Sequence, residues 1–251
     1  MTTNETTLVL CELAETGIDG LESFSPFCLK VHRALSAAGL SYERRRGHSP
    51  DAFRELNPAG QVPVLLVNGA PVYDSTRILA RIELLGGRSL LSNDRRTRAE
   101  QRLWEELADT ALNGFLVAAR WADDRNWPLV RDAYFAGAPA FVRAFVPGML
   151  RRKVVEALVA RDVWRNGAAE CWQRFETVLD DLDARAPAEG FWTGERVSVA
   201  DVALFGQLRS LCTDLTPWQK GAVRARPALS AWLERVDRAT ASARPLARVA
   251  A

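Results

Sequence analysis

Residues 62–75 read Val-Pro-Val-Leu-Leu-Val-Asn-Gly-Ala-Pro-Val-Tyr-Asp-Ser, and this stretch decides the fold class. Two short apolar runs flank Asn68-Gly69, and Asn-Gly is the preferred pair for the turn of a tight β-hairpin. Asp74-Ser75 follows the hairpin and is typical of a helix start, because such side chains accept hydrogen bonds from free amides of the first turn. The stretch therefore predicts two antiparallel strands that lead directly into a helix over residues 76–85.

Strand and helix signals also alternate before the hairpin. The apolar run at residues 7–11 predicts a buried strand. Ser25-Pro26 predicts the start of a helix that ends at Gly39, because Ser caps free amides and Pro has no amide hydrogen to leave unpaired. A short strand over 42–45 and a short helix over 50–56 complete the order βαβαββα, which predicts a mixed α/β domain.

Only helix signals follow Ser92. Long amphipathic patterns predict helices over 95–120 and 168–185, and a last helix over 227–240. Ser198-Val199-Ala200-Asp201 is a capping signature for another helix that reaches about Asp214. Between the first two of these helices, Gly137, Pro139, Pro147 and Gly148 interrupt residues 128–165, which predicts short helices or loop there.

Composition excludes several classes of function. The 251 residues carry 33 basic and 31 acidic side chains, so the net charge of +2 gives no reason to expect nucleic acid as a partner. No apolar run is long enough to span a membrane, and the N-terminus has no signal-peptide pattern. The four cysteines (Cys11, Cys28, Cys171 and Cys212) lack metal-ligand or disulfide spacing, so we expect no metal site and a reducing cytoplasmic location.

Four short motifs, in order along the chain, resemble the glutathione transferase superfamily. The motifs are Ser25-Pro26-Phe27-Cys28, the run Asn-Pro-Ala-Gly-Gln-Val-Pro at 57–63, Asp74-Ser75, and the stretch 192–201 that contains the capping signature. The resemblance implies a thioredoxin-like glutathione-binding domain over residues 1–88 and an all-helical bundle over residues 93–251. It also implies a cytoplasmic homodimer that acts in detoxification on glutathione and a hydrophobic electrophilic small molecule.

The same resemblance implies the residues that bind glutathione. Val62 precedes a cis-proline, Pro63, and presents its backbone to the cysteinyl part of the ligand. Asp74 and Ser75 lie at a helix N-terminus, where free amides and the helix dipole favour the γ-glutamyl carboxylate. His48 stands where several family classes place a polar side chain for the glycyl carboxylate, although an exposed loop histidine is an equal alternative.

Ser25 is the candidate that contacts the glutathione sulfur. Its position resembles the active serine or cysteine of serine- and cysteine-type members, where a hydroxyl donates to the sulfur and favours the reactive thiolate. Ser23 and Cys28 are alternatives, the latter as a nucleophile with a lowered pKa, and a pure helix-capping role for Ser25 stays open. Farther along the chain, the aromatic residues Phe115, Trp121 and Trp127 form either a wall for the second substrate or simple core.

Two segments depart from the ordinary family pattern. The loop at residues 14–24 is longer than in relatives and would lie beside the sulfur, as a lid or as a block. The extra length at residues 128–165 resembles a metaxin-like branch of the superfamily. We therefore predict a glutathione transferase, or an enzyme of related glutathione-dependent reduction or isomerisation. A non-catalytic metaxin-like binding protein and a Cys28-dependent thiol–disulfide exchange enzyme are the alternatives.

Overall fold

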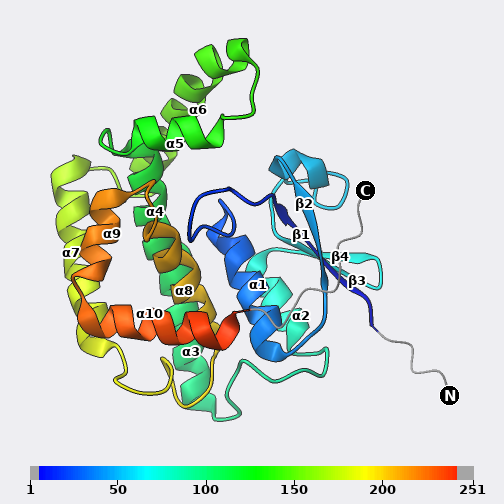
Figure 1. The fold of residues 1–251 in the computed structure, drawn as a ribbon. Coiled ribbons are helices and arrows are strands. Elements are labelled where there is room, and N and C mark those ends of the chain that lie inside the picture. The colour runs from blue at the N-terminus through cyan, green and yellow to red at the C-terminus, as the bar shows by residue number, and fades with distance from the viewer. Residues whose placement is uncertain (1–5, 242–251) are drawn as a thin grey trace.

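A computed structural model describes residues 6–241 of the chain (Figure 1). The segment Met1–Glu5, part of the N-terminus without a signal-peptide pattern, lies outside these residues. The first half contains one four-stranded sheet in the order β2-β1-β3-β4. β1 pairs in parallel with β2 and antiparallel with β3, and β3 and β4 form the predicted hairpin. The strands are β1 (Leu8–Leu13), β2 (Glu43–Gly47), β3 (Val64–Val67) and β4 (Ala70–Tyr73).

Two helices cover one face of this sheet, α1 (Pro26–Ala38) and α2 (Ser75–Ile82). Helix α1 begins and ends as the sequence predicts, with Ser25 as its N-cap and Gly39 in a left-handed conformation (φ 71°) as its C-cap. Apolar side chains of both helices pack on the sheet residues Leu10 and Leu65. The short helix η1 (Pro50–Phe53) packs on the opposite face. This arrangement confirms the predicted thioredoxin-like domain.

The second half of the described chain contains helices and no named strand, which confirms the other part of the predicted fold. A continuous rod runs from Arg95 to Ala122 through α3 (Arg95–Leu107), η2 (Ala108–Leu112), α4 (Asn113–Val117) and η3 (Ala118–Ala122). The remaining helices are α5 (Trp127–Tyr134), α6 (Ala140–Ala160), α7 (Gly167–Arg185), α8 (Val199–Leu211), α9 (Pro217–Arg224) and α10 (Pro227–Thr240). Helix α8 is buried along almost its whole length, with Ser198 and Asp201 forming the predicted capping box.

The segment 128–165 differs from the prediction of short helices or loop. Helix α6 has 21 residues and continues through Pro147 and Gly148 (Figure 1). Contacts beyond the proline hold it in place. Leu158 lies in the core of the helical half, and Arg151 donates to the carbonyl oxygens of Trp121 and Ala122. These contacts offset the hydrogen bond and the backbone fit that a proline removes from a helix. Sequence patterns also missed α9 altogether.

The two halves meet along α1 and α8. A Cβ atom on Gly206 would lie 2.8 Å from the carbonyl oxygen of Pro26, so only glycine permits this approach. Beside it, the fully buried Lys30 places its Nζ 2.7 Å from Glu105 Oε1 and 2.5 Å from Asp109 Oδ2. A tight backbone contact and a buried charge cluster therefore fix α1 against the helical half.

Candidate functional site

A cavity of about 420 Å³ opens at the N-terminal ends of α1 and α2, facing α5. Both apolar and polar residues line this cavity. The residues are Leu13, Phe24, Ser25, Phe27, Asn57, Gly60, Gln61, Val62, Pro63, Asp74, Ser75 and Tyr134. Four of the residues that the sequence singled out for glutathione and its sulfur, Ser25, Val62, Asp74 and Ser75, lie in this one cavity.

Three other predicted residues lie elsewhere. His48 is exposed and does not line the cavity, so its contact with the glycyl carboxylate stays a prediction. Ser23 is fully buried and accepts a hydrogen bond from the Ser25 amide at 3.2 Å, which makes it part of the support for Ser25. Cys28 is fully buried in the first turn of α1.

The environment of Cys28 suppresses its thiolate. Burial and the charge of Glu12 raise the pKa of this thiol to about 12, although hydrogen bonds with Ser25 and Ser23 act in the opposite direction. A nucleophilic cysteine needs the reverse, a lowered pKa and access to the substrate. This environment disfavours the alternative in which Cys28 exchanges disulfides.

Ser25 faces the cavity from the first position before α1. Its Oγ accepts the amide hydrogen of Cys28 at 3.3 Å, which is the N-cap bond of the helix. A hydroxyl group that accepts one such bond still has its own hydrogen to donate. Ser25 can therefore cap the helix and at the same time donate to a sulfur atom held in the cavity.

Asp74 and Ser75 bring a second helix N-terminus to the same cavity. Asp74 is the N-cap of α2, with Oδ1 accepting from the Arg77 amide at 3.0 Å, and Ser75 is the first helical residue. The backbone of Asp74 adopts φ 74°, an unusual value for a residue with a side chain. Two helix N-termini at one cavity make its potential favourable for anionic groups.

The segment before β3 forms the floor of the cavity. The Val62–Pro63 peptide is cis, as predicted. It comes directly before Val64, the first residue of β3, which pairs with β1. Asn57 holds this segment, because its Nδ2 donates to the carbonyl oxygen of Gln61 at 2.9 Å and its Oδ1 accepts from the Ala59 amide at 3.1 Å. Asn57 stands in the motif at 57–63, although the sequence assigned it no role.

The opposite wall consists of residues that the sequence did not predict. The rings of Phe24 and Tyr134 lie 4.2 Å apart between centroids, and both residues line the cavity. Arg120 holds both. Its Nη1 donates to the carbonyl oxygen of Phe24 at 2.7 Å and to Tyr134 Oη at 3.0 Å, and its Nη2 donates to the carbonyl oxygen of Ser210 at 2.9 Å. This wall joins an N-terminal loop to three different helical segments.

The three aromatic residues that the sequence suggested for a substrate wall, Phe115, Trp121 and Trp127, lie outside the cavity lining. Phe115 is buried in the helical core against Phe175. Trp121 and Trp127 stack on each other, and Trp121 also contacts the ring of Tyr134. None of the three lines the cavity, so they act as core or as support for Tyr134.

The long loop at 14–24 packs on the helical half. Leu21 forms a small apolar cluster with Val130 of α5 and Leu215, and Phe24 and Tyr134 lie at its edge. The loop and the segment 128–165 were the two departures from the family pattern, and they pack on each other. Together they build the wall opposite the predicted glutathione residues.

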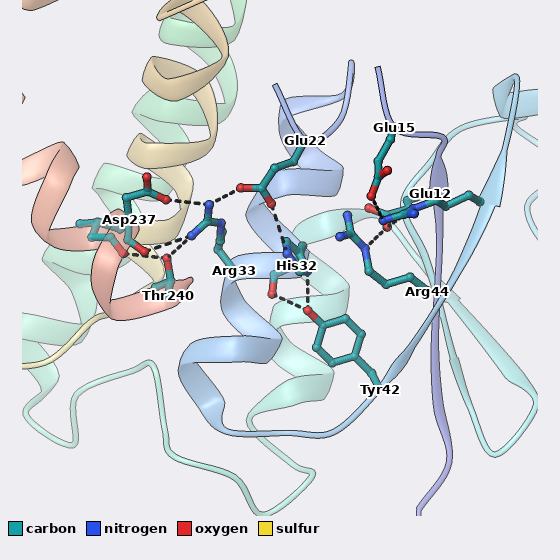
Figure 2. A network of polar contacts seen from close by, with 11 residues as sticks. Glu12, Glu15, Glu22, His32, Arg33, Tyr42, Arg44, Asp237 and Thr240 are labelled. Carbon is teal, nitrogen blue, oxygen red and sulfur yellow. Dashed lines mark hydrogen bonds and ion pairs between the residues drawn. The ribbon is translucent and has the colours of Figure 1, made fainter. Parts of the chain in front are cut away.

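Glu22 anchors this loop to α1 through a polar network (Figure 2). Its carboxylate pairs with Arg33 and lies 3.2 Å from His32 Nε2. Arg33 in turn contacts Asp237 at 2.7 Å and Thr240 at 3.1 Å on α10. Burial alone would raise the pKa of Glu22, but the hydrogen bond from His32 and the charge of Arg33 lower it to about 2. The loop beside Ser25 is therefore held by a carboxylate that is ionised at neutral pH.

Within residues 6–241, no group of three or more His, Cys, Asp or Glu side chains is placed to hold a metal ion. Over the same residues, no helix combines the length and the hydropathy that crossing a membrane requires.

Comparison with known protein families gives two matches in chain order. Residues 24–85 match the model of the glutathione S-transferase N-terminal domain, and residues 156–235 match that of the C-terminal domain. The cavity residues Phe24, Ser25, Val62, Asp74 and Ser75 all lie in the first match, whereas Tyr134 and Arg120 lie between the two.

Three individual proteins define the similarity further. The isoprene-epoxide–glutathione S-transferase of Rhodococcus sp. strain AD45 is 23% identical over 86% of this chain and 93% of its own length. A metaxin-2 homolog of Caenorhabditis elegans is 23% identical over 74% of this chain and 80% of its own length. Among solved structures, a glutathione S-transferase of Methylobacterium radiotolerans in complex with glutathione sulfonate has the same fold, with a TM-score of 0.60, 20% identity and 98% of each chain covered.

Proposed function

This chain belongs to the glutathione S-transferase family, and we propose that it binds glutathione in the cavity beside Ser25 and joins it through its sulfur to a hydrophobic electrophile. A related glutathione-dependent reduction or isomerisation would use the same site. The observation that carries the proposal is the meeting of Ser25, Val62, Asp74 and Ser75 in one cavity. These residues come from two helix N-termini and the segment before β3.

Each part of glutathione has a matching feature in this arrangement. The γ-glutamyl carboxylate fits the N-terminus of α2, where Ser75 and free amides donate, and Asp74 suits the ammonium group beside it. The backbone of Val62 suits the cysteinyl part, as an added strand would pair. The thiol then lies near Ser25, whose hydroxyl and helix N-terminus both favour the thiolate.

Catalysis would come from stabilising the thiolate and holding it near the electrophile. The apolar side chains of Leu13, Phe24, Phe27 and Tyr134 supply the surface for that second molecule. We further propose a cytoplasmic homodimer, His48 as a contact for the glycyl carboxylate, and domains over residues 1–88 and 93–251.

A binding protein without turnover is the second candidate. The similarity to a metaxin-2 homolog over 74% of this chain favours it. The burial and raised pKa of Cys28 speak against the third candidate, the thiol–disulfide exchange enzyme.

Calorimetric titration with glutathione, together with initial rates on a panel of aryl halides, alkyl halides, epoxides and enones, tests the proposal. We expect saturable glutathione binding and turnover of at least one electrophile class. Binding without turnover on the whole panel would favour the non-catalytic candidate, and absence of glutathione binding would reject the proposed transferase.

A further inference from the structure

We propose that Tyr134 donates a hydrogen bond, and then a proton, to the oxygen of the second substrate, so that the site selects electrophiles whose reaction leaves the electron pair on oxygen, such as epoxides. This inference rests on the proposed glutathione transfer, and it adds the substrate class and a further catalytic residue.

The hydrogen bonds of the Tyr134 hydroxyl carry the inference. Its oxygen accepts from Arg120 Nη1 at 3.0 Å, and within residues 6–241 no protein group accepts the hydroxyl hydrogen. The side chain is half-buried and lines the same cavity as Ser25. A phenol whose oxygen is already held, and whose hydrogen has no protein acceptor, can donate that hydrogen to a ligand in the cavity.

Arg120 is the positioning residue behind this phenol. It is buried in the helical half and donates only to neutral oxygens, those of Phe24, Tyr134 and Ser210, while its Nε has no partner. No carboxylate of the described chain forms an ion pair with it. A buried guanidinium without an acidic partner strengthens every interaction that places negative charge nearby.

The same arginine nitrogen places the phenol next to the sulfur site. Nη1 donates both to Tyr134 and to the carbonyl oxygen of Phe24, the residue immediately before Ser25. The electrophile would therefore lie with one end at the glutathione sulfur and the other at the phenol.

With an epoxide, the reaction is a ring opening. The thiolate sulfur forms a bond to one ring carbon, the bond from that carbon to oxygen breaks, and its electron pair moves to the oxygen. The oxygen takes the proton of the Tyr134 hydroxyl. Arg120 donates to the resulting phenolate, which regains a proton from water. An alkyl halide needs none of this, because its electron pair leaves with the halide ion.

Styrene oxide and benzyl chloride test the inference, because both carry a phenyl ring beside the reacting carbon but only the first leaves charge on oxygen. We expect Tyr134→Phe to lower kcat for styrene oxide about 10- to 100-fold, as loss of a hydrogen bond to a charged oxygen would. The variant should keep kcat for benzyl chloride and the Kd of glutathione within about threefold, as expected where no such bond is lost. Tyr42→Phe is the matched control, since its hydroxyl contacts His32 outside the cavity, and it should leave the ratio of the two rates unchanged.

Arg120→Lys keeps the charge but replaces the planar fork of donors by a single ammonium group, which does not reproduce the hydrogen bonds of Nη1 and Nη2 together, so it should lower the same ratio by a smaller factor. An equal fall of both rates in Tyr134→Phe, or no change with styrene oxide, would overturn the inference and leave glutathione transfer standing. So would a wild-type protein that uses benzyl chloride but not styrene oxide. Failure to bind glutathione would instead remove the proposed function and this inference together.

Discussion

The two walls of the cavity differ in how the chain builds them. The wall proposed for glutathione comes from short contiguous motifs, namely Ser25 with its helix, the segment 57–63, and Asp74-Ser75. The facing wall depends on Arg120, whose partners Phe24 and Ser210 lie 96 and 90 residues away in the sequence. One wall is encoded locally, and the other exists only after the two halves have packed.

Because of this difference, we expect the binding of glutathione to depend on the first wall and the choice of electrophile to depend on the second. The backbone amides, helix ends and turn of the first wall suit one ligand, a tripeptide with charges at both ends. The second wall is made by the loop at 14–24, most of which precedes the first matched family domain, and by helices that lie mainly between the two matched domains. Length and sequence can change in these segments without disturbing glutathione. We therefore expect substitutions in the first wall to affect every electrophile alike and substitutions in the second to change selectivity.

Ser25→Ala should give the largest loss of turnover, and the loss should be the same for every electrophile. Loss of a hydrogen bond to a charged sulfur is worth about 1.5–3 kcal/mol, or roughly one to two decades in rate. Turnover of styrene oxide and benzyl chloride should fall by the same factor, with the Kd of glutathione changed only a few-fold. The pKa of bound glutathione, followed by thiolate absorbance, should rise in the variant.

Ser25→Ala also removes a helix cap, which costs about 1 kcal/mol of stability. Asp94→Ala is the matched control, because Asp94 caps α3 through the Thr97 amide at 2.7 Å and does not line the cavity. It should lose similar stability and keep full activity. Full activity in Ser25→Ala, with loss of activity in Cys28→Ser, would mean that Cys28 and not Ser25 is the catalytic residue.

Gly206→Ala tests how much the close contact between the two halves contributes to stability. An added Cβ would meet the Pro26 carbonyl oxygen at 2.8 Å, so α1 or α8 must shift. Overpacking of this kind costs about 1–3 kcal/mol, measured as the free energy of unfolding in urea. Gly148→Ala is the control, because nothing lies within 4 Å of its added Cβ, and it should not destabilise. Equal stability of the two variants would show that α1 and α8 can move apart at little cost to accommodate the added Cβ.

Sequence patterns predicted the first wall well and the second hardly at all, for a physical reason. The helix caps at Ser25 and Asp74 are local features, since each depends on residues within a few positions along the chain. The cis peptide at Val62 was implied by the family resemblance and not by a local pattern. Tyr134 carries no such signal, because its place in the wall depends on Arg120 in another helical segment and on Phe24 in the N-terminal loop.

The helical segment 128–165 shows the same limit. The helix-breaking preference of Pro147 is a local signal, and contacts made by Arg151 and Leu158 with distant residues override it. The loop at 14–24 was visible as extra length, but its packing on α5 through Leu21 depends on a helix more than a hundred positions away.

Asp74→Asn should weaken glutathione binding by a smaller factor, about 5- to 10-fold, as the loss of one exposed charge interaction would. Asn preserves the helix cap and tolerates positive φ, so stability should be unchanged. Calorimetric titration measures the Kd, and both electrophiles should lose the same factor at limiting glutathione. An unchanged Kd would mean that Asp74 caps α2 and does not contribute to glutathione binding.

Glu22→Gln should give the smallest effect, and it should be confined to the second wall. Glu22 ties the loop that carries Phe24 to His32 and Arg33, so its loss should raise KM for the electrophile a few-fold, as loss of one partly exposed ion pair allows. The KM for glutathione should stay constant. Glu15→Gln is the control in the same loop, where an exposed carboxylate contacts Arg46 at 2.5 Å.

The pH dependence of stability gives the sharper test of Glu22. Its folded pKa of about 2 lies below the ordinary value of 4.5, so the ionised form stabilises the fold. This contribution is fully present above about pH 4.5 and is lost as the pH falls toward about 2. The side chain is 34% exposed, so the contribution is at most about 1 kcal/mol and decreases with salt. Urea unfolding of wild type and Glu22→Gln should therefore differ at pH 7 and converge below pH 4.5, whereas a constant difference would mean that the carboxylate charge does not hold the loop.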